Sequence, residues 1–116
     1  MAMQSIEQER AKAALQWAEK GVDSDTLAYA NGLPAMILMN GLGQTAAFYK
    51  SKGGKHEALY NLLSDWLTQP GKPYTGQALL SGITGGDAKA YRAAQTEALA
   101  YLQWVKKFAK AYCKGV

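Results

Sequence analysis

The segment "PAMILMNGLGQTAAFYKSKGGKH", residues 34–56, decides how the chain around it folds. It joins an apolar run to two glycines two residues apart, and it ends in a glycine pair with three lysines nearby. A segment of this kind is either a phosphate-binding loop or a pair of turns between helices. Most of the interpretation of the chain depends on which of the two it is.

The residues of this segment argue against a P-loop. That motif needs a strand followed by G-x-x-x-x-G-K-[ST], whose backbone amides wrap the phosphates and whose hydroxyl binds magnesium. Tyr49 stands where the first glycine belongs, His56 follows Lys55, and no strand pattern precedes them. The segment therefore predicts turns, with Asn40 and Gly41 ending a helix because both tolerate positive φ.

Helical patterns extend on both sides of the segment, and no stretch alternates apolar and polar residues for long enough to indicate a strand. Ser5 and Gln8 have the spacing of a capping box before a helix at 6–20. Pro34 suits the first turn of a helix, so we expect separate short helices at 23–31 and from residue 34. Further helices are expected at 44–52 with Ala47 and Phe48 inward, 55–68, 77–83 and 87–114.

The last of these helices, residues 87–114, is the longest, on the order of 40 Å at 1.5 Å per residue, and Asp87 can cap it. Residues that recur every seven positions predict its packing face: Tyr91, Ala98, Val105 and Tyr112, with Ala94, Tyr101 and Phe108. Trp104 lies off the centre of this face and is the best candidate for base stacking. The sequence predicts an all-α fold, a compact single-domain helical bundle of about six helices over residues 5–114.

Charge is distributed unevenly along the chain, which has 13 basic and 9 acidic residues and a formal net charge of +4. Acidic residues exceed basic ones in residues 1–49, whereas basic residues dominate from Asp87 onward. On a helical wheel of about 100° per residue, six basic side chains share one quadrant with Leu99. They are Lys89, Arg92, Lys106, Lys107, Lys110 and Lys114. This surface favours a polyanion partner, or copies that meet acidic end to basic end.

Few residues in the chain suit catalysis. There is one histidine, His56, and one cysteine, Cys113, with no G-x-S-x-G or S-x-x-K motif and no obvious pair of acids. We therefore expect no catalytic residue, metal site or cofactor. A single cysteine cannot form an internal disulfide, and neither a leader pattern nor an apolar run of membrane length is found, so the expected compartment is the cytoplasm.

The turn and two helical stretches together carry a resemblance. The turn motif consists of Leu33, Pro34, Ala35, Asn40, Gly41, Leu42, Gly43 and Gln44. With the stretches "EALYNLLSDWL" (57–67) and "EALAYLQWVKKFA" (97–109), it resembles the small subunit of the type III-B CRISPR effector, the Cmr complex that targets RNA. The resemblance covers nearly the whole chain, and the turn motif is its more specific part.

The resemblance implies an all-helical protein without nuclease activity, present in several copies along the guide RNA and target RNA. It also implies a role for the cations, because ammonium and guanidinium groups bind successive phosphates without reading sequence. The candidate nucleic-acid-binding residues are Lys50, Lys52, Lys55, Lys89, Arg92, Lys106, Lys107, Lys110 and Lys114. Expected partners are both RNAs, the other effector subunits and further copies of this chain, which in isolation is expected to be a monomer.

Two other functions remain open from the sequence. The chain could be a protein–protein interaction module of a larger complex, docking through apolar surface without RNA contact. A small hydrolase or nuclease would instead need a cluster of acids, or His56, in a pocket.

Overall fold

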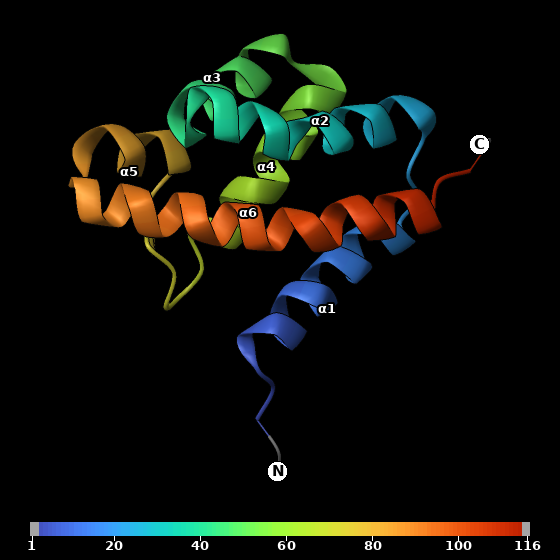
Figure 1. Ribbon diagram of the computed structural model, residues 1–116, viewed down its shortest axis with the longest axis horizontal. Helices are drawn as coiled ribbons and strands as arrows, with labels where there is room; N and C mark the ends of the chain where they lie inside the picture. Colours follow the sequence, from blue (N-terminus) through green and yellow to red (C-terminus); the bar gives the residue numbers. More distant parts are fainter. Residues whose placement is uncertain (1–2, 115–116) are drawn as a thin grey trace.

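Six helices account for most of the residues that the structure, a computed structural model, describes, which are residues 3–114 (Figure 1). The helix α6 (Ala88–Ala111) crosses the molecule, and the other helices pack around it. They are α1 (Ile6–Glu19), α2 (Ser24–Asn40), α3 (Leu42–Lys52), α4 (Gly54–Leu67) and α5 (Leu79–Gly85). The molecule is a flat slab of 43 × 42 × 22 Å. The predicted all-α bundle of about six helices is confirmed.

Side-chain caps fix where three of the helices begin. The hydroxyl of Ser5 accepts the backbone N–H of Gln8 at 3.1 Å, and the Gln8 side chain accepts the N–H of Ser5 at 2.8 Å. Asp23 and Asp87 each accept the N–H of the third residue after them, at 2.8 Å. Each cap supplies an acceptor to an N–H that has no partner inside its helix. The predicted capping box and the Asp87 cap are therefore confirmed.

The expected break before Pro34 is wrong, because α2 runs unbroken from Ser24 to Asn40 with the proline inside it. Pro34 has no N–H to donate to the preceding turn, which costs about 3 kcal/mol in a helix interior. Leu33 and Ile37 flank it and are both almost fully buried. Burial of two such side chains contributes roughly 1.5–3 kcal/mol each, enough to offset the lost hydrogen bond.

The turn at Gly41 is docked on α6. Its φ of +86° reverses the chain between α2 and α3, and a Cβ there would lie 2.9 Å from the Tyr91 hydroxyl. The backbone N–H of Leu42 donates to the Gln95 side chain at 3.0 Å, and that of Gly43 donates to the Tyr91 hydroxyl at 2.9 Å. The amides that a phosphate loop would offer to a ligand are thus bonded to α6, which confirms the assignment as a turn.

This docking also sets the rotation of α3 about its own axis. Thr45, Ala46 and Tyr49 face inward, whereas Ala47 is exposed and Phe48 is 43% exposed. The expectation that Ala47 and Phe48 face the core is therefore wrong. The helix begins at Leu42, two residues earlier than expected, and its first turn is held by α6.

Helix α6 ends at Ala111, so Lys114 does not share the helical face predicted for it. The backbone N–H of Lys114 instead donates to the carbonyl of Val22 at 3.1 Å, beside the link between α1 and α2. Tyr112 is the C-cap residue of α6 and is 40% exposed, so it is not part of the packing face. The buried residues of α6 are Ala94, Ala98, Tyr101, Leu102, Val105 and Ala109.

A charged network ties α1 to the rest of the bundle. The guanidinium of Arg10 donates to both carboxylate oxygens of Glu97, at 2.7 and 2.8 Å, and the indole N–H of Trp66 donates to the same carboxylate at 2.9 Å. Partial burial acts to raise the pKa of Glu97, but the hydrogen bonds from Arg10 and Trp66 outweigh it and lower that pKa below its ordinary value of 4.5.

We predict that Glu97→Gln lowers the free energy of unfolding at pH 7 by about 1–3 kcal/mol, because it removes a charged hydrogen-bond acceptor. The folded-state pKa lies below the unfolded one, so this contribution is complete above about pH 5 and is lost as the pH falls through the folded value. Urea titrations at pH 7 and pH 3 test both statements. Glu9→Gln, which removes an α1 carboxylate with no ion pair among the described residues, is the control. Equal effects of the two substitutions would contradict the assignment.

The packing of α5 generates a second prediction. A Cβ at Gly82 would lie 2.5 Å from Cδ1 and 2.7 Å from Cγ of the buried Tyr74 ring. Gly82→Ala should therefore destabilise the fold by about 1–3 kcal/mol through overpacking. The matched control is Gly32→Ala in α2, which meets no atom within 4 Å and should stabilise by about 0.5–1 kcal/mol. Thermal or urea unfolding distinguishes the two, and a neutral Gly82→Ala would show that α5 is loosely packed.

Candidate nucleic-acid interface

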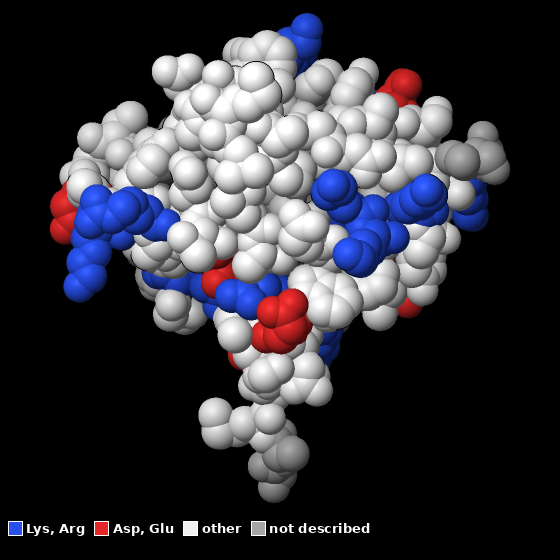
Figure 2. All heavy atoms as spheres, viewed as in Figure 1, with Lys and Arg blue, Asp and Glu red and all other residues white. Residues whose placement is uncertain are grey.

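The basic residues of α6 form two groups on one side of the molecule. Figure 2 shows Lys and Arg gathered over both ends of α6, with white surface over its middle and a mixed cluster of blue and red just below. We name Lys89 and Arg92 the N-terminal basic pair, and Lys106, Lys107 and Lys110 the C-terminal basic triad. Fourteen positions separate Arg92 from Lys106, which is about 21 Å along a helix. The six residues predicted to share a quadrant are thus a pair, a triad and Lys114 beyond the helix end.

The C-terminal basic triad is free of ion pairs within residues 3–114. Lys107 and Lys110 are exposed and Lys106 is half-buried. The three side chains, with Asn31 and Ala111, line a shallow groove of about 370 Å³. Three ammonium groups within five positions of one helix, none of them in an ion pair among the described residues, make a locally positive potential that attracts anions.

The three remaining predicted residues lie elsewhere and are largely paired. Lys50 and Lys52 are in the last turn of α3, and Lys55 is in the first turn of α4, with Gly53 between the two helices. The ammonium of Lys55 lies 2.9 Å from a carboxylate oxygen of Asp23 and 3.1 Å from one of Asp25. Lys50 lies 3.4 Å from Glu57, and Lys52 is placed over the Phe48 ring, 5.9 Å from its centroid. These lysines therefore belong to helix ends, and two of the three have their own counter-ions.

The same pairing shifts pKa values at the start of α2. The backbone N–H of Thr26, followed by the ammonium of Lys55, lowers the pKa of Asp23 to about 2. The hydrogen bond to Asp23 in turn raises the pKa of Lys55. Both groups remain charged across the physiological range, so Lys55 stays engaged with α2.

The aromatic residues of α6 divide between core and surface. Tyr101 is buried and its ring stacks on Trp66, with 4.7 Å between centroids. Trp104 is half-buried, stacks on Phe108, and donates its indole N–H to the carboxylate of Glu7. The candidate for base stacking is therefore already bonded to α1.

His56 lies in an aromatic cluster instead of on an open surface. Its ring stacks on Tyr29 with 3.8 Å between centroids and meets Tyr49 edge-on at 5.1 Å. In the part of the chain that the structure describes, no group of three or more His, Cys, Asp or Glu residues is placed to hold a metal ion. No helix of residues 3–114 is both long and apolar enough to cross a bilayer.

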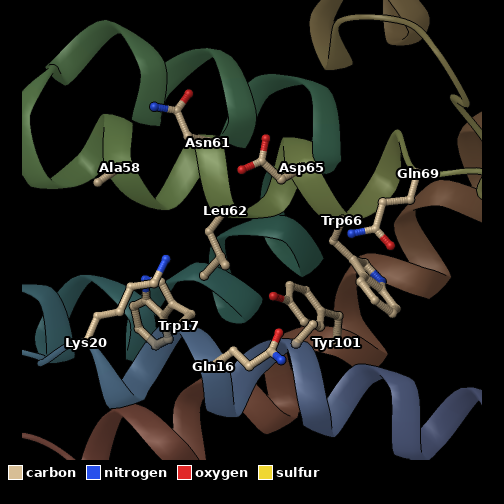
Figure 3. A pocket seen from close by; sticks show the side chains of 11 residues that line it. Gln16, Trp17, Lys20, Ala58, Asn61, Leu62, Asp65, Trp66, Gln69 and Tyr101 are labelled. Atoms are coloured by element: carbon tan, nitrogen blue, oxygen red, sulfur yellow. The ribbon is translucent and has the colours of Figure 1, made fainter.

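Sequence reasoning missed a groove of about 440 Å³ between α1 and α4, which α6 closes from below (Figure 3). Its lining residues come from three parts of the chain that are more than 30 positions apart, so no local motif reveals it. The groove is lined by Ala13, Gln16, Trp17, Lys20, Ala58, Asn61, Leu62, Asp65, Trp66, Gln69 and Tyr101. The one available signal was the run of exposed polar residues at helical spacing on α4, opposite its buried leucine stripe.

A protein family matches the chain over all six helices. A family model described as CRISPR-associated protein (Cas_Cmr5) matches residues 6–112. The matched region contains the Gly41 turn, the α4 stripe and the whole of α6, which carried the resemblance seen in the sequence. The chain therefore belongs to the Cas_Cmr5 family of CRISPR-associated proteins and is a small subunit of the Cmr complex.

Proposed function

We propose that this subunit contacts the RNA backbone of the Cmr complex through the basic face of α6 and takes no catalytic part. The observation that supports the proposal is the C-terminal basic triad, which is open to solvent and has no carboxylate partner among the described residues. Cations in this arrangement bind phosphates of any sequence, so base pairing with the guide RNA would supply the specificity.

The two basic groups on α6 suit an extended ligand. The N-terminal basic pair and the C-terminal basic triad lie on one side of a straight helix, about 21 Å apart. Phosphates of one duplex can reach both groups, whereas a single small anion cannot. Lys50, Lys52 and Lys55 contribute less in this proposal, because acidic side chains already neutralise two of them.

We propose that several copies of the chain stack along the RNA in the assembled complex and that the isolated chain is a monomer. Each chain completes a core of its own, so folding does not require a partner. Charge pairs between exposed surfaces contribute only about 0–1 kcal/mol each, too little to hold copies together without RNA or another subunit.

A second candidate function is supported by a different observation. Leu38 and Met39, at the end of α2, are 70% and 81% exposed. A pair of large apolar side chains exposed to solvent favours contact with another protein. In this alternative the subunit docks on its neighbours and touches no RNA.

We predict that the triple variant Lys106→Gln, Lys107→Gln, Lys110→Gln weakens binding of the purified chain to a guide–target RNA duplex. A plot of the logarithm of the binding constant against the logarithm of salt concentration has a negative slope. In the triple variant this slope should be shallower by about 2 to 3, because each lysine that contacts a phosphate releases about one counter-ion. Fluorescence anisotropy at a series of salt concentrations measures both quantities.

The matched control is Lys50→Gln, Lys52→Gln, Lys55→Gln, which removes the same charge from three lysines of which two are ion-paired. In this control, the slope of the logarithm of the binding constant against the logarithm of salt concentration should change by less than 1. Equal losses in the two variants would mean that net charge, not the α6 face, determines binding. Unchanged binding in both would favour the protein-docking alternative.

The proposal that the subunit takes no catalytic part gives a separate prediction. The purified chain should not cleave target RNA with Mg²⁺ or Mn²⁺. A Cmr complex reconstituted without it should bind target RNA more weakly, yet cleave the bound fraction at an unchanged rate. Binding and single-turnover cleavage are scored separately. Metal-dependent cleavage by the chain alone would overturn the proposal.

A further inference from the structure

The groove between α1 and α4 (the α1–α4 groove) continues along α1. A second hollow of about 500 Å³ shares Ala13, Gln16, Trp66 and Gln69 with it and extends to Gln4, Glu9 and Lys12. From Glu9 to Lys20 the α1 side spans roughly 16 Å at 1.5 Å per residue. An extended chain of about five residues has this length at 3.3 Å per residue.

The polar side chains along the α1–α4 groove have no partners of their own. Among the described residues, none of the side chains of Gln16, Lys20, Asn61, Asp65 and Gln69 forms a hydrogen bond or ion pair. Figure 3 shows them on both walls of the groove. Amide groups both donate and accept, as the N–H and C=O groups of a peptide do.

Tyr101 gives the groove a fixed polar group at its base. The residue is only 1% exposed, and its ring is held against Trp66, yet its hydroxyl points into the groove between α1 and α4 (Figure 3). No hydrogen bond to this hydroxyl is formed within residues 3–114. Burial, and then the charge of Asp65, raise the pKa of Tyr101, so the hydroxyl keeps its proton. A nearly buried hydroxyl without an internal partner is available to a bound ligand.

The charges of the groove favour a protein over RNA. Glu9 and Asp65 balance Lys12 and Lys20, so the groove has no net charge, unlike the C-terminal basic triad. Carboxylates beside the ligand path would repel phosphates. The half-buried Trp17 and Leu62 add apolar surface suited to an uncharged side chain.

We propose that the α1–α4 groove binds an extended, uncharged polypeptide segment of another protein subunit of the Cmr complex. The segment hydrogen-bonds through its backbone to the amides and to the Tyr101 hydroxyl, and it places an apolar side chain against Trp17 and Leu62. This inference goes beyond the proposed RNA contact and does not depend on it.

The experiment measures the affinity of the purified chain for a Cmr complex reconstituted from guide RNA and its other subunits without this chain. Tyr101→Phe removes only the hydroxyl and should weaken binding about threefold to tenfold. Ala58→Arg places a long side chain in the groove from an exposed position on α4 and should weaken binding more than tenfold. The unfolding midpoint of each variant is measured as well, to show that the fold is kept.

Ala47→Arg, at an exposed position of α3, is the matched control because it adds the same charge outside the groove, and it should change affinity less than twofold. Both arginine variants should bind free RNA duplex equally, which separates this test from that of the α6 face. A photo-crosslinking residue at Asn61 should capture another protein subunit. Crosslinks to RNA or to a second copy of this chain, or equal affinities of Ala58→Arg and Ala47→Arg, would overturn the proposal.

Discussion

The attachment of the Gly41 turn to α6 is the constraint on which the rest of the architecture depends. Two backbone amides at the start of α3 donate to Tyr91 and Gln95, and both the positive φ of Gly41 and the nearby Tyr91 hydroxyl disfavour a side chain there. This contact holds the end of α2 and the start of α3 against the first half of α6, while the earlier part of α2 lies along the second half of α6 (Figure 1). Because that side of α6 is then covered, its basic side remains in solvent.

Helix α6 thus combines two surfaces that have different requirements. Its covered side uses small residues, Ala94, Ala98 and Ala109, together with Tyr101 and Leu102, so that neighbouring helices approach closely. Its open side has cations at both ends and uncharged residues between them. The two uses do not compete, because side chains on opposite sides of a helix do not meet.

Local signals in the sequence predict most of the fold. The caps at Ser5 and Asp87 and the turn at Gly41 depend on residues a few positions apart, and the structure confirms them. The expected break at Pro34 failed because burial around Leu33 and Ile37 outweighs a local preference. The shared face of the six cations was only partly predictable, since helix ends depend on tertiary contacts such as that between Lys114 and Val22.

The polar groove and the ion pairs could not be predicted in the same way. Arg10 and Glu97 are 87 positions apart, and Lys55 meets Asp25 across 30 positions. Nothing in the composition indicates which of the nine candidate cations have counter-ions. The charge pattern identified the basic residues, but only the arrangement of helices shows that Lys50 and Lys55 have counter-ions whereas the C-terminal basic triad has none among the described residues.

The modest apolar contact of α1 has a consequence for its dynamics. Only two of its side chains, Ala14 and Ala18, are fully buried, and polar bonds of Arg10 to Glu97 and of Trp104 to Glu7 supply part of its remaining attachment. Segments with little buried apolar surface open more often than the core does. Backbone amides of α1 should therefore exchange with deuterium sooner than those of α6, and occupation of the adjacent groove would slow that exchange.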